Sequence, residues 1–151
     1  MFEIPKLIII PVIAVVVTQL LKFIIKGVSG EWRWSVLSEY GGMPSAHTAF
    51  VTSLSTVVLI AEGVSSVAFA ICFVFSIIII RDAIGFRQFL GQHGKILNVL
   101  VKKLPKKEEA KYSQGLVERL GHTPFQALIG GLLGIFFGIL LYYCLPAYWV
   151  T

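Results

Sequence analysis

Two short segments of this chain place a histidine beside a hydroxyl residue and a proline. One is Gly41-Gly42-Met43-Pro44-Ser45-Ala46-His47-Thr48, and the other is Arg119-Leu120-Gly121-His122-Thr123-Pro124-Phe125. Ser and Thr are good helix caps, and proline is tolerated in the first helical turn. Each segment therefore predicts a helix start whose unpaired N–H groups attract an anion, next to a histidine that can transfer a proton. The alternative is that each segment is only a capped helix start and that its histidine has no chemical role.

A set of cations and one acid accompany these segments: Lys22, Lys26, Arg33, Arg81, Arg87 and Asp82. Metal-ligand spacings such as His-x3-His or a cysteine cluster are absent from the sequence, so the pattern predicts a phosphate site without a metal or other cofactor. Phosphoryl transfer of that kind needs cations, a nucleophile and an acid. Asp82 is expected either to serve the reaction or to form an ion pair with Arg81 or Arg87, because an unpaired acid at a span end is costly.

The composition indicates where these residues must sit. Hydrophobic residues make up 56% of the 151 residues, charged residues 14%, and the mean hydropathy is +0.83. A water-soluble domain of this size cannot bury so much apolar surface. The chain is therefore expected to be an all-α, polytopic membrane protein forming a single domain over residues 1–151. Cys72 and Cys144 lie in apolar runs and predict no disulfide framework, and the N-terminal run does not resemble a cleavable signal.

Run lengths predict four transmembrane helices, at residues 4–25, 45–61, 64–80 and 125–145. Residues 84–101 predict a further helix in the polar region between the last two spans. The charged stretch 102–109 then predicts a solvated loop near anionic headgroups, in preference to a nucleic-acid site. The last span has a ridge at Gly130, Gly134 and Gly138, which predicts close packing of another helix or a homodimer through this face.

The distribution of positive charge predicts the orientation. Of thirteen Lys and Arg residues, only Lys6 falls on the side that holds the termini and the Glu62-Gly63 turn. By the positive-inside rule the opposite side, with both histidine segments, is cytoplasmic. We therefore expect an integral membrane protein, in a bacterial plasma membrane, with its termini outside and its site at the cytoplasmic face.

These motifs resemble the type 2 phosphatidic acid phosphatase superfamily, which shares its phosphate site with vanadium haloperoxidases. That family has K-x6-R-P, then P-S-G-H, then S-R-x5-H-x3-D. Lys26 and Arg33 have the first spacing with Trp34 in place of proline, and residues 44–47 match the second motif with Ala46 in place of glycine. The third motif differs from the family pattern at two positions. Leu116 stands six residues before His122, where the family has arginine, and Gln126 stands four residues after it, where the family has aspartate.

The chain matches more fully the motifs of a small divergent branch of this superfamily, which is found in bacteria and plants. The branch shows G-G-M-P-S-x-H, D-A-x-G-x-R and L-G-H-T-P, which correspond in order to residues 41–47, 82–87 and 120–124. The resemblance implies a metal-independent phosphatase that acts on a lipid or polyprenyl phosphate through a phosphohistidine. The runner-up is a non-catalytic protein that binds, scaffolds or flips a lipid phosphate.

The resemblance also implies a role for each matching residue. His122 would be the nucleophile, and His47 would protonate the leaving oxygen. Asp82 would take the place of the missing acid at Gln126. The phosphoryl oxygens would be bound by Lys26, or by Lys22 one helical turn before it, together with Arg33, Arg81, Arg87 and the backbone amides near Ser45.

Overall fold

The computed structural model describes residues 6–30, 41–112 and 115–145, and in these residues the chain is helical without a strand. The helices are α1 (Lys6–Val28), α2 (Ala46–Glu62), α3 (Val67–Arg81), a π-helix (Asp82–Phe86), α4 (Arg87–Val101), α5 (Lys106–Glu109), a 3-10 turn (Ala110–Tyr112) and α6 (Pro124–Cys144). The chain is an all-α polytopic membrane protein, as the composition predicts.

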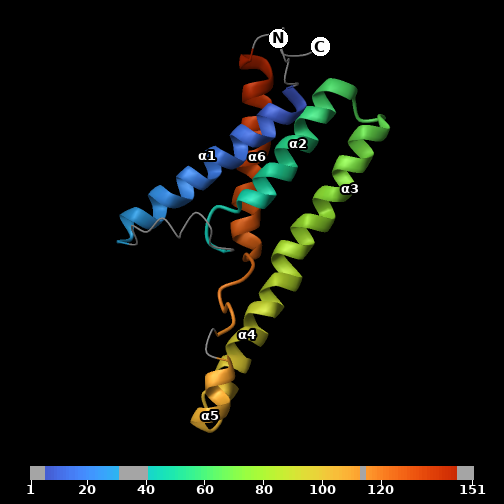
Figure 1. Ribbon diagram of the computed structural model, residues 1–151. Coiled ribbons are helices and arrows are strands. Elements are labelled where there is room, and N and C mark those ends of the chain that lie inside the picture. Colours follow the sequence, from blue (N-terminus) through green and yellow to red (C-terminus); the bar gives the residue numbers. More distant parts are fainter. Residues whose placement is uncertain (1–5, 31–40, 113–114, 146–151) are drawn as a thin grey trace, which may run out of the picture.

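Three of the helices described are long and apolar enough to cross a membrane: α1, the continuous helix Val67–Val101, and α6. The predicted second span, α2, is also apolar but has only 17 residues. At 1.5 Å per residue it rises about 26 Å, slightly less than the ~30 Å hydrocarbon core. Because α2 packs against α1, α3 and α6 (Figure 1), its buried Thr48 and Ser53 are turned toward other helices, as its polar composition predicts.

The glycine ridge of α6 is filled by α2 of the same chain. A Cβ atom at Gly130 would overlap the carbonyl of Ser45, and one at Gly134 would overlap Thr52 Oγ1 and the carbonyl of Ala49. A Cβ atom at Gly138 would lie 3.0 Å from Thr56 Cβ and 3.3 Å from the carbonyl oxygen of Ser53, a tight approach without overlap. The ridge therefore provides the close helix packing that its spacing predicts. A second copy of the chain could use the same ridge only by displacing α2.

The third span and the following helix are joined, contrary to the predicted break at Arg81-Asp82. Helices α3 and α4 form one 35-residue helix, Val67–Val101, and the sequence motif Asp82–Arg87 forms the π-helical segment within it and the residue that follows. The backbone N–H of Arg87 donates to the carbonyl of Asp82, five residues earlier. Such π-turns are often found at functional sites, because the insertion changes which carbonyls are available to other partners.

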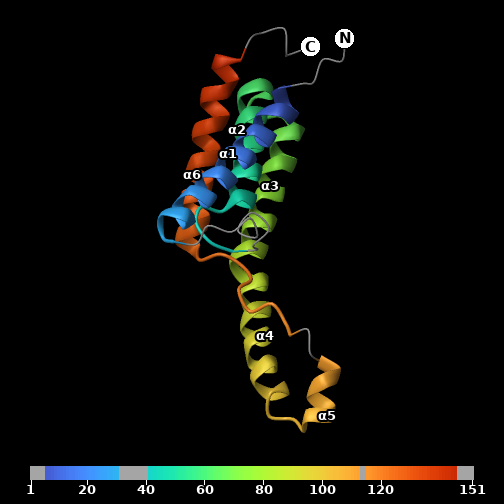
Figure 2. The same cartoon turned by 60° about the vertical axis from the view of Figure 1, so that its left-hand side comes forward.

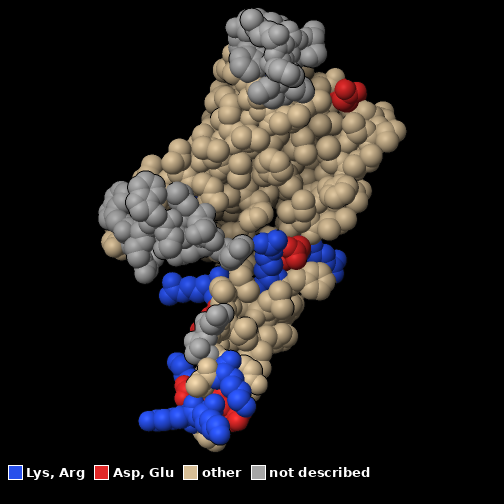
Figure 3. Space-filling model, in the orientation of Figure 1, with Lys and Arg blue, Asp and Glu red and all other residues tan. Residues whose placement is uncertain are grey.

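The two ends of the bundle differ in chemistry. At one end, the ammonium group of Lys6 donates to the carbonyls of Tyr142 (3.0 Å) and Leu145 (2.8 Å), which joins the start of α1 to the end of α6. At the other end the starts of α2 and α6 lie near the π-helix, and α4 projects beyond the bundle (Figures 1 and 2). In Figure 3 the basic side chains gather at this second end and on the projecting tip, while the face of the bundle is nearly free of charge.

Candidate functional site

The start of α2 brings the first histidine segment to the polar end of the bundle. Ser45 is the N-cap, and its Oγ accepts from the N–H of Thr48 at 3.4 Å. The helix begins at Ala46, so Pro44 precedes the cap and does not occupy the first helical turn as its type predicts. A side chain at Gly42 would contact the Cε atoms of Lys22 and Lys26. Both lysines of α1 therefore reach the segment that precedes His47.

The start of α6 lies against the start of α2. Thr123 and Gln126 form a capping box, in which the N–H of Thr123 donates to Gln126 Oε1 at 3.0 Å and the N–H of Gln126 donates to Thr123 Oγ1 at 3.3 Å. The predicted cap and opening proline are thus confirmed. The N–H of Ser45 donates to the carbonyl of Gln126 at 3.2 Å, which ties the two helix starts together. The two histidine segments, far apart in sequence, are neighbours in the fold.

His122 is held at two points in front of α6. Its backbone N–H donates to the carbonyl of Ala83 in the π-helix at 2.9 Å, and its Nδ1 lies 3.1 Å from the carbonyl oxygen of Gly42. Gly121 permits this approach, because it has φ +84° and a Cβ there would meet the backbone of Arg87 and Gln88. Since a carbonyl oxygen only accepts, the proton of a neutral imidazole resides on Nδ1 and Nε2 has an available lone pair.

The surroundings of His122 favour its neutral form. Only 5% of the residue is exposed. This burial lowers the pKa of His122 below its ordinary value, and the positive charges of Lys22 and of protonated His47 act in the same direction. Hydrogen bonding to the Gly42 carbonyl and to the Gln126 side chain raises the pKa and offsets part of that effect. The result is an imidazole that stays neutral below the pH at which an exposed histidine becomes protonated.

His47 is an exposed residue on which three other members of the site act. His47 lies within electrostatic range of Lys22, Arg87 and Asp82, and within range of His122. Asp82 accepts a hydrogen bond from Arg87 Nε at 2.7 Å. Of the two alternatives for Asp82, the ion pair with Arg87 is therefore the one present. The contact that orients the ring of His122, expected from a carboxylate, is made by the carbonyl of Gly42. The Asp82 carboxylate instead fixes the guanidinium of Arg87.

A cavity of about 280 Å³ opens beside His122. It is lined by residues from four parts of the fold, namely Lys26 of α1, Gly41 and Gly42 before α2, Gln88 of α4, and residues 119–123 with Gln126 at the start of α6. Lys22, His47, Asp82 and Arg87 do not line it. Of the cations of the site, Lys22 and Arg87 act on His47, whereas Lys26 and Arg119 line the cavity, and Lys22 also reaches Gly42 in the cavity wall.

The structure separates the remaining predicted phosphate ligands. Arg33 lies outside the described residues. Arg81 lines a shallow apolar hollow with Ile77 and Ile80, and it is not among the charges that act on either histidine. The N–H and Oγ of Ser45 are both engaged in joining and capping helices. Lys22, only 2% exposed, is the lysine that acts on both histidines, whereas Lys26 lines the cavity.

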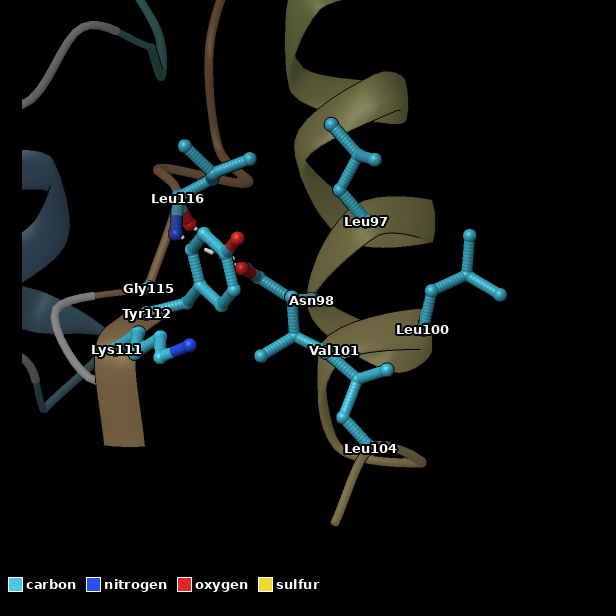
Figure 4. Close-up of a pocket in the computed structure, with 9 residues that line it drawn as sticks. All are labelled: Leu97, Asn98, Leu100, Val101, Leu104, Lys111, Tyr112, Gly115 and Leu116. Atoms are coloured by element: carbon cyan, nitrogen blue, oxygen red, sulfur yellow. Dashed lines mark hydrogen bonds between the residues drawn. The ribbon is translucent and has the colours of Figure 1, made fainter. Parts of the chain in front are cut away.

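A larger cavity, of about 650 Å³, lies away from the histidines, between α4 and the chain that returns toward α6 (Figure 4). Its walls are mainly leucine and valine side chains, with Lys111 as the one charged residue that lines it. Across it, Asn98 Nδ2 donates to the carbonyl of Leu116 at 2.8 Å, and Asn98 Oδ1 accepts from the N–H of Leu116 at 2.8 Å. This clamp holds the returning segment on α4 and so supports the position of Arg119 and His122.

Comparisons with known proteins identify relatives of the chain. The chain is 37% identical over 141 residues to an uncharacterized membrane protein, YuiD, of Bacillus subtilis (strain 168), and the match covers 86% of this chain and 89% of that protein. No solved structure matches the chain. The model of the divergent PAP2 family matches residues 5–137, a range that includes all three motifs and both histidines of the site. The chain therefore belongs to the divergent PAP2 family.

Proposed function

We propose that this protein is a lipid phosphate phosphatase that acts through a phosphohistidine on His122. The observation that supports this most strongly is the contact of His122 Nδ1 with the Gly42 carbonyl at 3.1 Å. It leaves Nε2 as the nucleophilic nitrogen, in a buried position that disfavours protonation. The substrate class is a lipid or polyprenyl phosphate, because the site lies at the end of apolar helices, where a phosphate headgroup meets water.

The proposed reaction has two steps. The phosphoryl oxygens are bound by Lys22 and Arg87, with Lys26 on the cavity side. Nε2 of His122 forms a bond to phosphorus, the bond from phosphorus to the lipid oxygen breaks, and His47 donates a proton to that oxygen. Water then attacks the phosphohistidine, its proton passes to neutral His47, and inorganic phosphate is released. The Lys22 and Arg87 cations supply the charge stabilisation that the equatorial oxygens require, and Asp82 holds Arg87 in place.

The proposed location of the site is the cytoplasmic face. Lys6 lies at the opposite end of the bundle, where it caps α6. The other described Lys and Arg residues lie from Lys22 onward toward the polar end, and α4 and α5 extend the basic surface further (Figure 3). The positive-inside rule assigns such an end to the cytoplasm. A substrate in the cytoplasmic leaflet would then present its phosphate directly to the two helix starts.

A second candidate is a protein that binds a lipid phosphate without turning it over, for scaffolding or flipping. One observation favours it, namely that the nearby carboxylate of Asp82 is bonded to Arg87 and not to His122. An imidazole held by a carbonyl receives less charge stabilisation than one held by a carboxylate. Catalysis in this protein is therefore expected to be slower than in a site with a histidine–carboxylate pair.

The experiment that tests the proposal compares two histidine variants. Detergent-solubilised protein is assayed for phosphate release from a panel of lipid phosphates, without added metal. His122→Ala should lower turnover by about 10²–10⁴-fold, the range for losing a group of this type. His93→Ala is the matched control, because His93 is exposed on α4 and does not line the cavity. Near-normal turnover by a folded His122→Ala protein would refute the proposed role.

A further inference from the structure

One face of helix α4 is covered by the chain that returns toward α6. A Cβ atom at Gly91 or at Gly94 would lie 2.7 or 2.8 Å from a backbone carbonyl oxygen of the returning segment 116–120. On the same side of the helix, Asn98 forms two hydrogen bonds with Leu116. Because these positions are three and four residues apart, they form one continuous face. This face of α4 is therefore filled within the chain.

The opposite face of α4 carries a row of exposed side chains, which we call the α4 stripe. The stripe consists of Phe86, Leu90, His93, Leu97 and Leu100. Its four apolar members are 46–68% exposed, and Figure 4 shows Leu100 directed away from the returning segment. The spacing along the stripe is 4, 3, 4 and 3 residues. An apolar repeat of 3.5 residues is the seam through which one helix packs along another in a coiled coil.

The α4 stripe lies beyond the apolar layer of the membrane. The continuous helix Val67–Val101 has 35 residues, so at 1.5 Å per residue it is about 52 Å long, whereas the hydrocarbon core is ~30 Å thick. About 20 residues cross the core, and the remaining ~15, which is the length of α4, project at the polar end of the bundle (Figures 1 and 2). Lipid tails therefore do not cover the stripe, and a row of exposed leucines in water indicates a protein contact.

We infer that the α4 stripe is the interface with a second copy of this chain, in a parallel and in-register pair of α4 helices. Both copies cross the membrane in the same orientation, so their α4 helices project in the same direction and identical stripes face each other. The exposed surface of the stripe is roughly 500 Å² per copy, so a pair buries ~1,000 Å², the size expected of a specific interface. His93 meets its own counterpart only in the in-register pair, and a single polar residue in a seam favours one register.

The rest of the structure is compatible with this pairing. The glycine ridge of α6 is already occupied by α2, so a dimer must use another face of the molecule. The stripe lies on the side of α4 away from the returning segment, so a second helix can approach without displacing it. None of the stripe residues lines the cavity beside His122. The inference therefore does not depend on the proposed phosphatase reaction.

The first test is cross-linking of the full chain in native membranes, in a background that lacks Cys72 and Cys144. Leu100→Cys should form a disulfide-linked dimer on mild oxidation, because facing positions of a parallel seam come within reach of a disulfide. Val99→Cys is the matched control, since Val99 is 50% exposed and Leu100 52%, but Val99 lies outside the stripe. Absence of a cross-link at position 100, or equal cross-linking at both positions, would overturn the inference.

The second test measures the mass of the detergent-solubilised chain by light scattering over a dilution series. Leu100→Asp should raise the dissociation constant of the dimer at least ~10²-fold, because each copy loses a buried leucine and the two carboxylates face each other. Val99→Asp should leave the constant unchanged, and circular dichroism checks that both variants are helical. A monomeric native chain, or unchanged dimerisation of Leu100→Asp, would overturn the inference. So would a monomer in reconstituted vesicles whose position 100 is protected from a water-soluble thiol reagent, which would assign the stripe to the membrane surface.

Discussion

The packing of α2 against α6 sets the distance between the two histidine segments, and one pair of glycines tests it. A Cβ at Gly134 would overlap Thr52 Oγ1 and the Ala49 carbonyl, whereas a Cβ at Gly131 would meet the methyl groups of Thr48 and Thr52 at 3.4 and 3.7 Å. The second set is ordinary van der Waals contact. Both glycines lie within α6, so Gly→Ala improves helix propensity by a similar amount, about 1 kcal/mol, in each variant.

The difference between the variants therefore isolates the overlap at Gly134. Overpacking of a filled interface costs about 1–3 kcal/mol, and we expect the upper end because the Ala49 carbonyl cannot move without moving α2. Gly134→Ala should thus be about 3 kcal/mol less stable than Gly131→Ala. Reversible unfolding by SDS in mixed micelles, followed by circular dichroism, measures both. Equal stabilities would show that α2 and α6 do not pack through this ridge.

Four further predictions concern the site and its orientation. The pH profile of kcat/KM, which reports the free enzyme, should keep its activity below pH ~6.5, the ordinary pKa of histidine, because burial lowers the pKa of His122. Lys22→Met should move the acidic limb to higher pH by removing a nearby positive charge, and a limb above ~6.5 in the native protein would contradict this. The same lowered pKa means that the unfolded chain binds more protons, so the free energy of unfolding should decrease as pH falls below ~6.5, and a smaller decrease in His122→Ala than in the native protein identifies the contribution of His122. Single cysteines at Ser65 and Lys106, in a background lacking Cys72 and Cys144, should label from opposite sides, with an impermeant reagent reaching only position 65 in intact cells; the reverse pattern would place the site outside. Vanadate should bind at least ~10²-fold more tightly than phosphate to a site shaped for phosphoryl transfer, and comparable affinities would favour the binding protein.

The local features of the fold follow from the sequence. Ser45, Thr123 and Pro124 mark helix starts because their side chains and fixed φ angles act within one turn, and the apolar runs mark the membrane helices. Gly130, Gly134 and Gly138 predict close packing, but spacing alone does not distinguish α2 from a second copy of the chain. The motif residues His47, Asp82, Arg87 and His122 are all near one another, as their shared side of the membrane predicts.

The features that the sequence does not reveal depend on backbone groups and on tertiary proximity. Every residue has a carbonyl, so no residue type marks the Gly42 oxygen as the partner of His122 Nδ1, or the Ala83 oxygen as the partner of its N–H. The π-helix that joins α3 to α4 is likewise invisible to hydrophobic periodicity. Arg119 meets Gln88 of α4 at the cavity because the returning segment, held by the Asn98–Leu116 clamp, lies along α4. The position of Arg119 three residues before His122 was the available signal.

The most direct test of the central claim is to look for the phosphoryl group on the protein. Detergent-solubilised protein is mixed with a lipid phosphate, quenched rapidly at alkaline pH to preserve phosphohistidine, and analysed by peptide mass spectrometry. We predict one phosphoryl group on the peptide that contains His122, absent from His122→Ala and accumulated in His47→Ala when a substrate with a good leaving group is used. Phosphate release without phosphorylation of His122, or phosphorylation of His47 in its place, would contradict the account.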